Sequence, residues 1–398
     1  MTANKRPTAG KVTQVTRCKT SGRTFLKTPF TNQGESVSKI ESLRTDLYRI
    51  PLRNTLSDST HGVMIDFELI TVRVRDSDGV EGVGYTYTVH AGGAAIAVMI
   101  SRYLSDLVIG QDPDMTEKIW QDMWWRLHYA GRGGHQTSAI SAVDIALWDL
   151  RAKRAGLPLW RFFGGFDPAV PVYAGGIDLM FPIEQLLEQA DSFVAQGFRA
   201  IKMKVGRPRL REDLERIARM REHLGVDFAL MVDANMKWTA DQAVAAARQM
   251  QQFGLVWLEE PTIPDDIIGH ARVVREGGMP VASGENLHTL MEFQQLISAG
   301  GVTFPEPDVA NIGGYTGFNK VCALAEAFNL PVTSHGVHDL TIHCLAAAPN
   351  RTYMEAHGFG LDAYMRDSMT IVDGFAIAPE RPGHGVELDF DKLESVRD

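Results

Sequence analysis

Hydrophobic and polar positions alternate in the first part of the chain and then take up a helical period. Residues 67–75 alternate and are rich in β-branched side chains, and residues 80–87 repeat the pattern after a turn. Both stretches are typical of β-strands joined as a hairpin. Residues 138–154 instead place apolar side chains on one broad helical face, and Gly156-Leu157-Pro158 ends that helix. We therefore predict an N-terminal α+β capping domain over residues 37–165.

After residue 165, short apolar strands alternate with amphipathic helices. This repetition implies a parallel sheet, and eight units predict an α/β fold with a closed (β/α)8 barrel of modified TIM type rather than an open doubly wound sheet. We assign residues 166–365 to this catalytic barrel and residues 366–398 to a segment that returns to the capping domain. The predicted strands are 170–174, 200–205, 229–233, 256–259, 281–284, 304–308, 332–334 and 353–355.

The first 36 residues differ in composition from the rest of the chain. Seven basic residues and no acidic residue occur before Glu35, and Thr and Ser are frequent. The apolar stretch of a secretory signal does not follow. Organelle transit peptides share this composition, but no amphipathic helical pattern accompanies it. We predict a disordered or loosely attached arm over residues 1–36.

Composition and charge limit the classes of function. The 398 residues include 40 basic and 49 acidic side chains, a formal net charge of −9, which makes nucleic acid an unexpected partner. Hydrophobic residues make up 44% and charged residues 22%, as in ordinary globular proteins. No run approaches the ~18 apolar residues of a membrane span, so we expect no membrane association. Cys18, Cys322 and Cys344 are widely spaced and predict reduced thiols in a cytoplasmic protein.

Ionisable residues recur where the predicted barrel strands end. Lys202 and Lys204 are two residues apart, so they point to the same side of their strand. All strands of a (β/α)8 barrel end at one face, where the active sites of this fold lie. Each motif alone is common on protein surfaces, but a regular succession over consecutive strands is not. The later strand ends carry Asp233 with Asn235, Glu259 with Glu260, Glu285 with Asn286, Asp308, His335 and Glu355.

Three of these acids, Asp233, Glu259 and Glu285, come from neighbouring strands. Carboxylates held close together repel one another unless a cation neutralises them. Oxygen ligands without His or Cys suit Mg²⁺ better than zinc. We therefore predict a Mg²⁺ site with the two lysines on one side and His335 on the other. Asp308, one strand earlier, can orient the imidazole and raise its basicity.

Longer segments around these residues form a wider pattern: 141–149, 201–206, 231–235, 257–261, 284–286, and 307–308 with 313–314, followed by Ser334-His335 and Glu355. Over nearly the whole chain from about residue 40, this pattern resembles the enolase superfamily and, within it, the mandelate racemase subgroup. Residues 84–87 and 90–93 also resemble the acid-sugar dehydratases that act on talarate and galactarate. The resemblance implies that the three acids bind Mg²⁺ and that the chain forms a homo-oligomer, a tetramer or an octamer.

The resemblance also implies catalytic roles. Lys204 would be one base and His335, paired with Asp308, the opposite one, acting on a proton next to a carboxylate. Lys202 would contact that carboxylate, and Glu355 would donate a hydrogen bond to it. A base must titrate near neutrality, so we expect neighbouring cations to lower the pKa of Lys204. Because Glu355 must be protonated to donate, we expect its pocket to raise its pKa.

The enediolate formed in this first step does not fix the product. We favour Mg²⁺-dependent dehydration of a polyhydroxy (aldonic or aldaric) acid sugar to a 2-keto-3-deoxy acid, the reaction of a hydro-lyase. Racemisation, epimerisation and cycloisomerisation through the same enediolate stay open, whereas two opposed bases argue against a non-catalytic binding protein. A polar lid over residues 53–62 suits a hydroxyl-rich substrate. We expect Arg53, His61 and Asn235 to bind substrate, with Arg53 receiving the distal carboxylate if the substrate is a diacid. We assign no role to Glu306 or His338.

Overall fold

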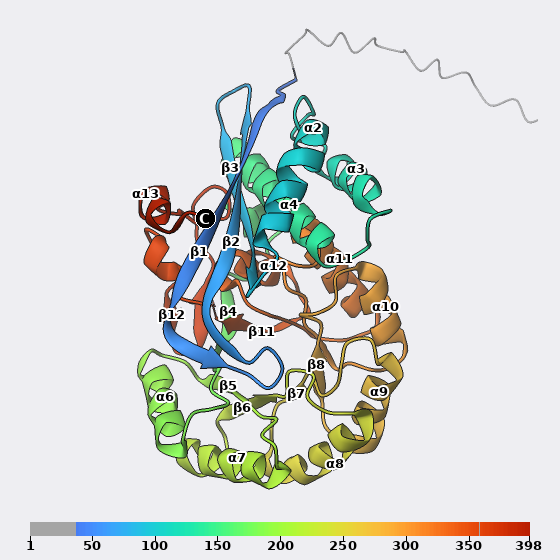
Figure 1. Cartoon of the computed structure of the whole chain (residues 1–398), viewed down its shortest axis with the longest axis vertical. Helices are drawn as coiled ribbons and strands as arrows, with labels where there is room; N and C mark the ends of the chain where they lie inside the picture. The colour runs from blue at the N-terminus through green and yellow to red at the C-terminus, as the bar shows by residue number, and fades with distance from the viewer. Residues whose placement is uncertain (1–36, 358) are drawn as a thin grey trace, which may run out of the picture. The chain divides into compact units, whose positions relative to one another are not determined.

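The computed structural model describes residues 37–357 and 359–398 (Figure 1). The predicted arm over residues 1–36, which includes Cys18, lies outside these ranges. Cys322 and Cys344 are buried free thiols. None of the helices in the described ranges is both long and apolar enough to cross a lipid bilayer.

A three-stranded antiparallel sheet forms the centre of the capping domain. Its strands are β1 (Ile40–Ser57), β2 (Val63–Asp76) and β3 (Glu81–Val89), with β2 in the middle. Helix α4 (His135–Arg154) packs against β3 (Figure 1). This approach requires glycine, because a Cβ at Gly82 or Gly84 would lie 2.1 or 2.2 Å from a carbonyl oxygen of α4. The remaining helical segments are α1 (Gly93–Met99), η1 (Ile100–Leu104), α2 (Ser105–Val108) and α3 (Thr116–Leu127).

The sequence predicted the hairpin of β2 and β3 but not β1. β1 lies at the edge of the sheet, where one side of the strand makes no ladder bonds and the alternation of buried and exposed positions is irregular. Pro51, which cannot donate a backbone hydrogen bond, is tolerated at such an edge. The register also shifts between Pro51 and Leu56.

The barrel contains eight parallel strands close to the predicted positions. They are β4 (Ala169–Gly175), β5 (Ala200–Lys204), β6 (Ala229–Asp233), β7 (Leu258–Glu259), β8 (Val281–Ser283), β9 (Phe304–Pro305), β10 (Val332–Ser334) and β11 (Arg351–Ala356). Strands β4 to β9 pair in chain order, β10 pairs with β11, and β11 pairs with β4. The backbone N–H of His335 donates to the Pro307 carbonyl (3.3 Å), and this hydrogen bond connects the segments that follow β10 and β9. The predicted barrel fold is confirmed.

Seven α-helices lie between the eight strands over residues 169–356. They are α6 (Ile183–Ala195), α7 (Leu210–Leu224), α8 (Ala240–Met250), α9 (Ile267–Arg272), α10 (Leu290–Ser298), α11 (Gly314–Ala327) and α12 (His338–Ala347). The last strand, β11, is followed by the 3₁₀ turn η4 (Leu361–Tyr364) in place of an eighth helix. Short helical segments complete the chain: α5 (Leu159–Phe162), η2 (Gln251–Phe253), η3 (Val273–Gly277), α13 (Phe390–Leu393) and η5 (Glu394–Val396).

Aromatic side chains fill the barrel interior below the strand ends. Tyr173 packs edge-on against Trp257, with ring centroids 5.4 Å apart, and Tyr353 packs against both rings. Phe304 packs against Trp257 at a tilt, with ring centroids 5.2 Å apart. The interior is therefore a packed core, as in other barrels of this type. The chemistry is expected at the face where the parallel strands end.

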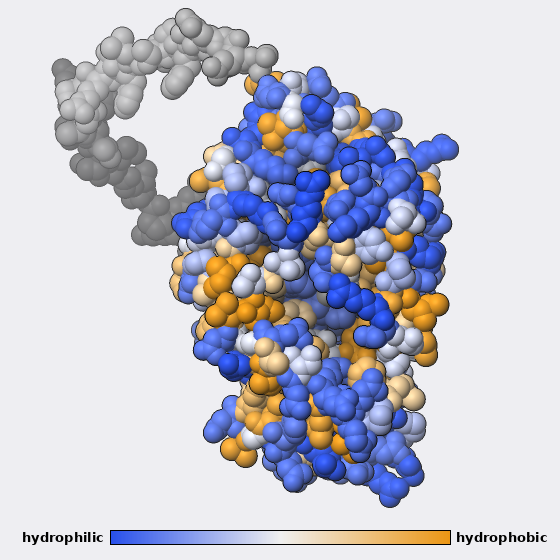
Figure 2. All heavy atoms as spheres, turned by 90° about the vertical axis from the view of Figure 1, so that its left-hand side faces the viewer, coloured by the Kyte–Doolittle hydropathy of each residue, from blue (hydrophilic) through white to orange (hydrophobic). Residues whose placement is uncertain are grey.

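The C-terminal segment runs from the barrel to the capping domain. β12 (Ile371–Val372) and β13 (Phe375–Ile377) form a hairpin, and β13 pairs antiparallel with β4. Near its end, the Asp398 N–H donates to the Leu47 carbonyl (3.0 Å) and Arg397 pairs with Asp46 (2.8 Å) on β1. Hydrophilic and hydrophobic side chains are interspersed on the face that bears this segment (Figure 2).

Candidate active site

A cavity of about 500 Å³ lies between the strand ends of the barrel and the capping domain. Six of the predicted site residues reach it from the barrel, and one reaches it from the capping domain. The predicted residues in its lining are Lys204, Asn235, Glu285, Asp308, His335, Glu355 and His61. Asp233, Glu259 and Lys202 lie directly beneath these groups and are fully or almost fully buried.

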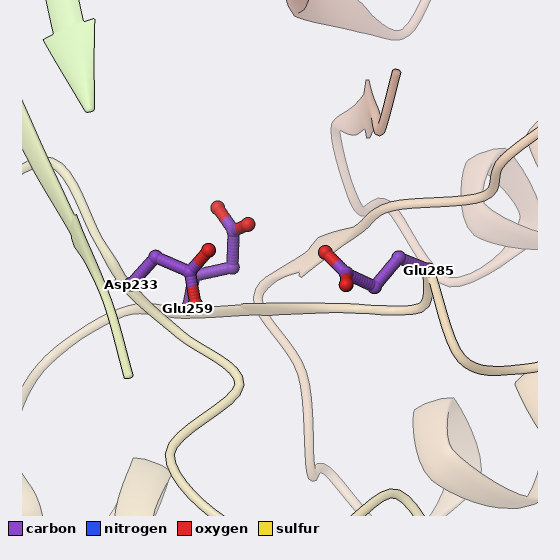
Figure 3. A group of neighbouring side chains, drawn as sticks. All are labelled: Asp233, Glu259 and Glu285. Atoms are coloured by element: carbon purple, nitrogen blue, oxygen red, sulfur yellow. The ribbon is translucent and has the colours of Figure 1, made fainter. Parts of the chain in front are cut away.

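The three predicted metal ligands meet at one point. Asp233 ends β6, Glu259 ends β7 and Glu285 follows β8, and each offers an oxygen within 4.8 Å of the other two. Figure 3 shows their carboxylates directed into a common space. The Glu285 Oε2 atom is buried without a hydrogen-bond partner among the described residues. An all-oxygen set that includes an atom without a hydrogen bond fits a Mg²⁺ ion.

The two lysines of β5 hold the acids together from one side. The Lys202 ammonium contacts Glu259 and lies 2.9 Å from Glu355 Oε1, while the Lys204 ammonium lies 2.5 Å from Asp233 Oδ2. Burial alone would lower the pKa of Lys204, but the Asp233 carboxylate raises it above its ordinary value. This direction is opposite to the expected one, which included the positive charge of Mg²⁺ as well as that of Lys202. A carboxylate, and not the neighbouring Lys202, dominates the surroundings of this ammonium.

His335 and Asp308 form a pair on the opposite side. The His335 Nδ1 lies 2.9 Å from Asp308 Oδ2, and Asp308 Oδ1 accepts the Ala310 N–H (2.7 Å). The His335 Nε2 faces the acids, 3.5 Å from Glu285 and 3.8 Å from Glu355. Burial lowers the pKa of His335, but the Glu285 and Asp308 carboxylates outweigh this and raise it well above its ordinary value.

Glu355 differs from the expectation. Its burial favours the neutral form, but Lys202, His335 and the Gly336 N–H, which donates to Oε2 (2.9 Å), stabilise the carboxylate. Together they lower the pKa of Glu355 below its ordinary value. The expected raised pKa is wrong in this arrangement, because the side chain lies between two cationic groups and not in an apolar pocket.

The tip of the β1–β2 hairpin, which forms the second half of the predicted lid over residues 53–62, rests on the barrel. The Ser59 hydroxyl donates to the Ala234 carbonyl (2.7 Å), next to Asp233, and Thr60 donates to the Asn235 carbonyl. His61 lines the cavity and pairs with Asp58 (2.8 Å).

Arg53 does not line this cavity. It borders a separate hollow of about 790 Å³ and pairs with Asp362 (2.9 Å), so the structure does not bring it to the acids. From the β1–β2 hairpin, Asp58, His61 and Met64 line the cavity instead.

Glu306 and His338 lie outside the cavity lining. Glu306 is buried inside the barrel and accepts a hydrogen bond from the Tyr173 hydroxyl (3.1 Å). Burial and the Glu259 carboxylate raise the pKa of Glu306 well above its ordinary value. Glu306 therefore makes its contacts inside the barrel and does not reach the cavity.

Sequence reasoning missed several residues that line the cavity. Tyr87 comes from β3, and its place in residues 84–87, which resemble acid-sugar dehydratases, was a signal that did not single it out. His357 follows β11 and has a pKa lowered to about 3, because it is buried. His288 and Asn311 bond to each other (2.9 Å) in loops without a recognisable pattern. Such loop residues become neighbours only when the barrel closes.

Comparison with known proteins gives two family matches. Residues 50–164 match the N-terminal domain of the mandelate racemase / muconate lactonizing enzyme family. Residues 185–392 match the family described as enolase C-terminal domain-like.

Individual relatives include enzymes that act on acid sugars. The 3,6-anhydro-alpha-L-galactonate cycloisomerase of Streptomyces coelicolor is 66% identical over 354 residues, which cover 89% of this chain and 98% of the relative. The L-talarate/galactarate dehydratase of Salmonella typhimurium is 35% identical over 361 residues, 89% and 90% of the two chains.

Solved structures agree with these sequence matches. A racemase from Streptomyces coelicolor with bound magnesium has a TM-score of 0.89 at 64% identity, covering 90% of this chain and 100% of that one. The Salmonella typhimurium L-talarate/galactarate dehydratase liganded with Mg and L-lyxarohydroxamate has a TM-score of 0.88 at 32% identity, covering 96% of each chain. The chain therefore belongs to the mandelate racemase / muconate lactonizing enzyme family of the enolase superfamily.

Proposed function

We propose that this protein is a Mg²⁺-dependent cycloisomerase that opens the ring of a 3,6-anhydro sugar acid such as 3,6-anhydro-L-galactonate. The observation that carries the proposal is the placement of Lys204 against Asp233 and of His335 against Glu285, which puts two groups able to transfer protons beside one carboxylate triad. The identity of 66% over almost the whole length of the Streptomyces cycloisomerase supports this substrate class.

The reaction is a β-elimination within one molecule. A base removes the proton from C2, the electron pair forms a C2–C3 double bond, and the C3–O bond of the anhydro ring breaks. The ring oxygen remains on C6 and takes up a proton, and the enol becomes a 2-keto-3-deoxy acid. No atom is lost, so the net change is an isomerisation. A dehydratase breaks the same C3–O bond, but the oxygen leaves as water.

Removal of a proton next to a carboxylate creates a doubly negative enediolate, which the site must stabilise. When bound by Asp233, Glu259 and Glu285, Mg²⁺ would supply positive charge for this purpose. Lys202, buried beside the triad, adds a second fixed positive charge. Lys204 and His335 exchange protons with C2 and with the leaving oxygen from their two sides of the cavity, and Asp308 holds the His335 Nδ1 so that Nε2 is the reactive nitrogen.

Dehydration of an aldonic or aldaric acid is the second candidate. The polar lid and the identity of 35% to the talarate/galactarate dehydratase favour it. However, Arg53, the residue expected to receive a second carboxylate, points to a different hollow and pairs with Asp362. This placement favours a substrate with a single carboxylate.

The test is incubation in D₂O with Mg²⁺ and separate acids: 3,6-anhydro-L-galactonate, aldonates and aldarates, followed by proton NMR. A 2-keto-3-deoxy product from the anhydro acid supports the proposal. A keto-deoxy acid formed from an aldonate or an aldarate, and not from the anhydro acid, would replace the proposal with dehydration. Exchange at C2 without product would indicate racemisation. Lys204→Met and His335→Asn are expected to be folded and inactive, whereas Lys118→Met, which removes an exposed lysine of α3, keeps full activity.

A further inference from the structure

Strand β3 of the capping domain directs three successive hydroxyl groups to the barrel. The Tyr85 hydroxyl donates to Asp339 Oδ2 (2.6 Å) at the start of α12. The Thr86 hydroxyl donates to the Ala310 carbonyl (2.8 Å). The Tyr87 hydroxyl donates to Asp308 Oδ2 (2.9 Å). The end of this strand is thereby tied to the loops that follow β9 and β10.

Tyr87 and His335 meet at the same carboxylate oxygen. Asp308 Oδ2 accepts from both side chains at 2.9 Å, and the Tyr87 oxygen lies 3.5 Å from His335 Nδ1. The other oxygen of Asp308 accepts the Ala310 N–H. Both oxygens of Asp308 are therefore occupied, and the carboxylate cannot rotate without breaking a hydrogen bond.

Tyr87 is held in its donor role. Burial and the Asp308 carboxylate raise the pKa of Tyr87 well above its ordinary value, so the hydroxyl keeps its proton and donates it to Asp308. Its ring packs on Phe359, with centroids 5.5 Å apart, which limits the positions of the hydroxyl.

We propose that Tyr87 is a positioning residue of the His335–Asp308 pair: the capping domain supplies the hydroxyl that fixes Asp308, and Asp308 in turn aims His335 Nε2 at the substrate. The inference rests on the proposed function, in which His335 transfers a proton. Docking of the capping domain then assembles the proton-transfer group in addition to covering the cavity.

The first experiment compares Tyr87→Phe with Tyr85→Phe on the acid that the wild-type enzyme converts. Both variants lose one hydroxyl from the same face of β3, but only Tyr87 bonds to Asp308. We expect Y87F to lower kcat about tenfold, as loss of a group that orients a reactive ligand typically does, with KM within about twofold of wild type. Y85F is expected to change kcat by less than about twofold.

A double-mutant comparison separates positioning from general damage. If Tyr87 acts through Asp308, adding Y87F to Asp308→Asn lowers kcat no further. Equal losses in Y87F and Y85F, or multiplying losses in the Y87F/D308N protein, would overturn the proposal.

A spectroscopic measurement does not depend on turnover. In protein labelled with ¹⁵N-histidine, the ring signals of His335 are identified by their absence from His335→Asn. We expect Y87F to shift these signals and Y85F to leave them in place. Unchanged His335 signals in Y87F would overturn the inference even if the substrate is not the anhydro acid, and absence of conversion of any acid sugar would count against the proposed function alone.

Discussion

Substitution of Glu285 by Gln tests whether this residue binds a metal ion or only stabilises the fold. Glu285 Oε2 makes no hydrogen bond within the described part of the chain, so the amide replaces the carboxylate without breaking one at that atom. The substitution removes one negative charge from the triad and retains the shape of the side chain. We expect its effect on the free energy of unfolding to depend on whether Mg²⁺ is present.

The expected magnitudes follow from the distances. The ligand atoms of the three acids lie within 4.8 Å of one another, so repulsion of Glu285 by each of the other two acids amounts to at least about 3.5 kcal/mol at an effective dielectric constant of about 20. Attraction between Glu285 and a protonated His335 at 3.5 Å offsets about 5 kcal/mol of this repulsion. Without Mg²⁺ the variant is therefore expected to be at least as stable as wild type, with a gain of about 2 kcal/mol from these charges.

With Mg²⁺ the order reverses. A cation at about 100 times its Kd stabilises the wild-type fold by about 2.7 kcal/mol, whereas a 100-fold loss of affinity leaves a gain of about 0.4 kcal/mol. The measurement is urea unfolding followed by tryptophan fluorescence, on EDTA-treated protein with and without MgCl₂. Glu215→Gln, on the exposed side of α7, is the control for loss of one charge. Equal stabilisation of E285Q and wild type by Mg²⁺ would refute the assignment of the metal site.

Three further outcomes are expected. Ser59→Ala combined with Thr60→Ala removes the two hydroxyls that hold the lid on the barrel, and at about 1 kcal/mol each we expect KM to rise about tenfold or more in steady-state kinetics. Lys202→Met leaves buried acids without their cation, so we expect a loss of about 3–5 kcal/mol in Mg²⁺-free urea unfolding; a loss below about 1 kcal/mol would contradict this. Burial lowers the pKa of His343 to about 3, so only the unfolded state gains its proton near pH 6.5. Stability from this group is therefore present above that pH and lost below it, by about 1.4 kcal/mol between pH 7.5 and 5.5. His343→Gln is expected to lack this component when the two proteins are unfolded in urea at both pH values.

The sequence determined the barrel because its signals are local. Each strand is a short apolar run bounded by turns, and each helix has an amphipathic period, so neighbouring residues alone define them. The order of ionisable residues at strand ends then predicted the cluster of Asp233, Glu259 and Glu285, since parallel strands of one barrel end at one face. The sequence did not predict β1, because this edge strand contains charged side chains and Pro51. It therefore lacks the alternation of apolar and polar residues that marks β2 and β3.

Only the tertiary structure decided how these groups influence one another. The pKa values of Lys204 and Glu355 shift in the directions opposite to expectation, because Asp233 and Lys202 are their nearest charged neighbours. Arg53 lies beside a different hollow, although it is only eight positions from His61. The sequence indicates which side chains reach the barrel mouth, but electrostatic and hydrogen-bond energies depend on separations of a few ångström. Those separations are set by contacts between residues far apart in the chain, such as Tyr87 and Asp308, which are 221 positions apart.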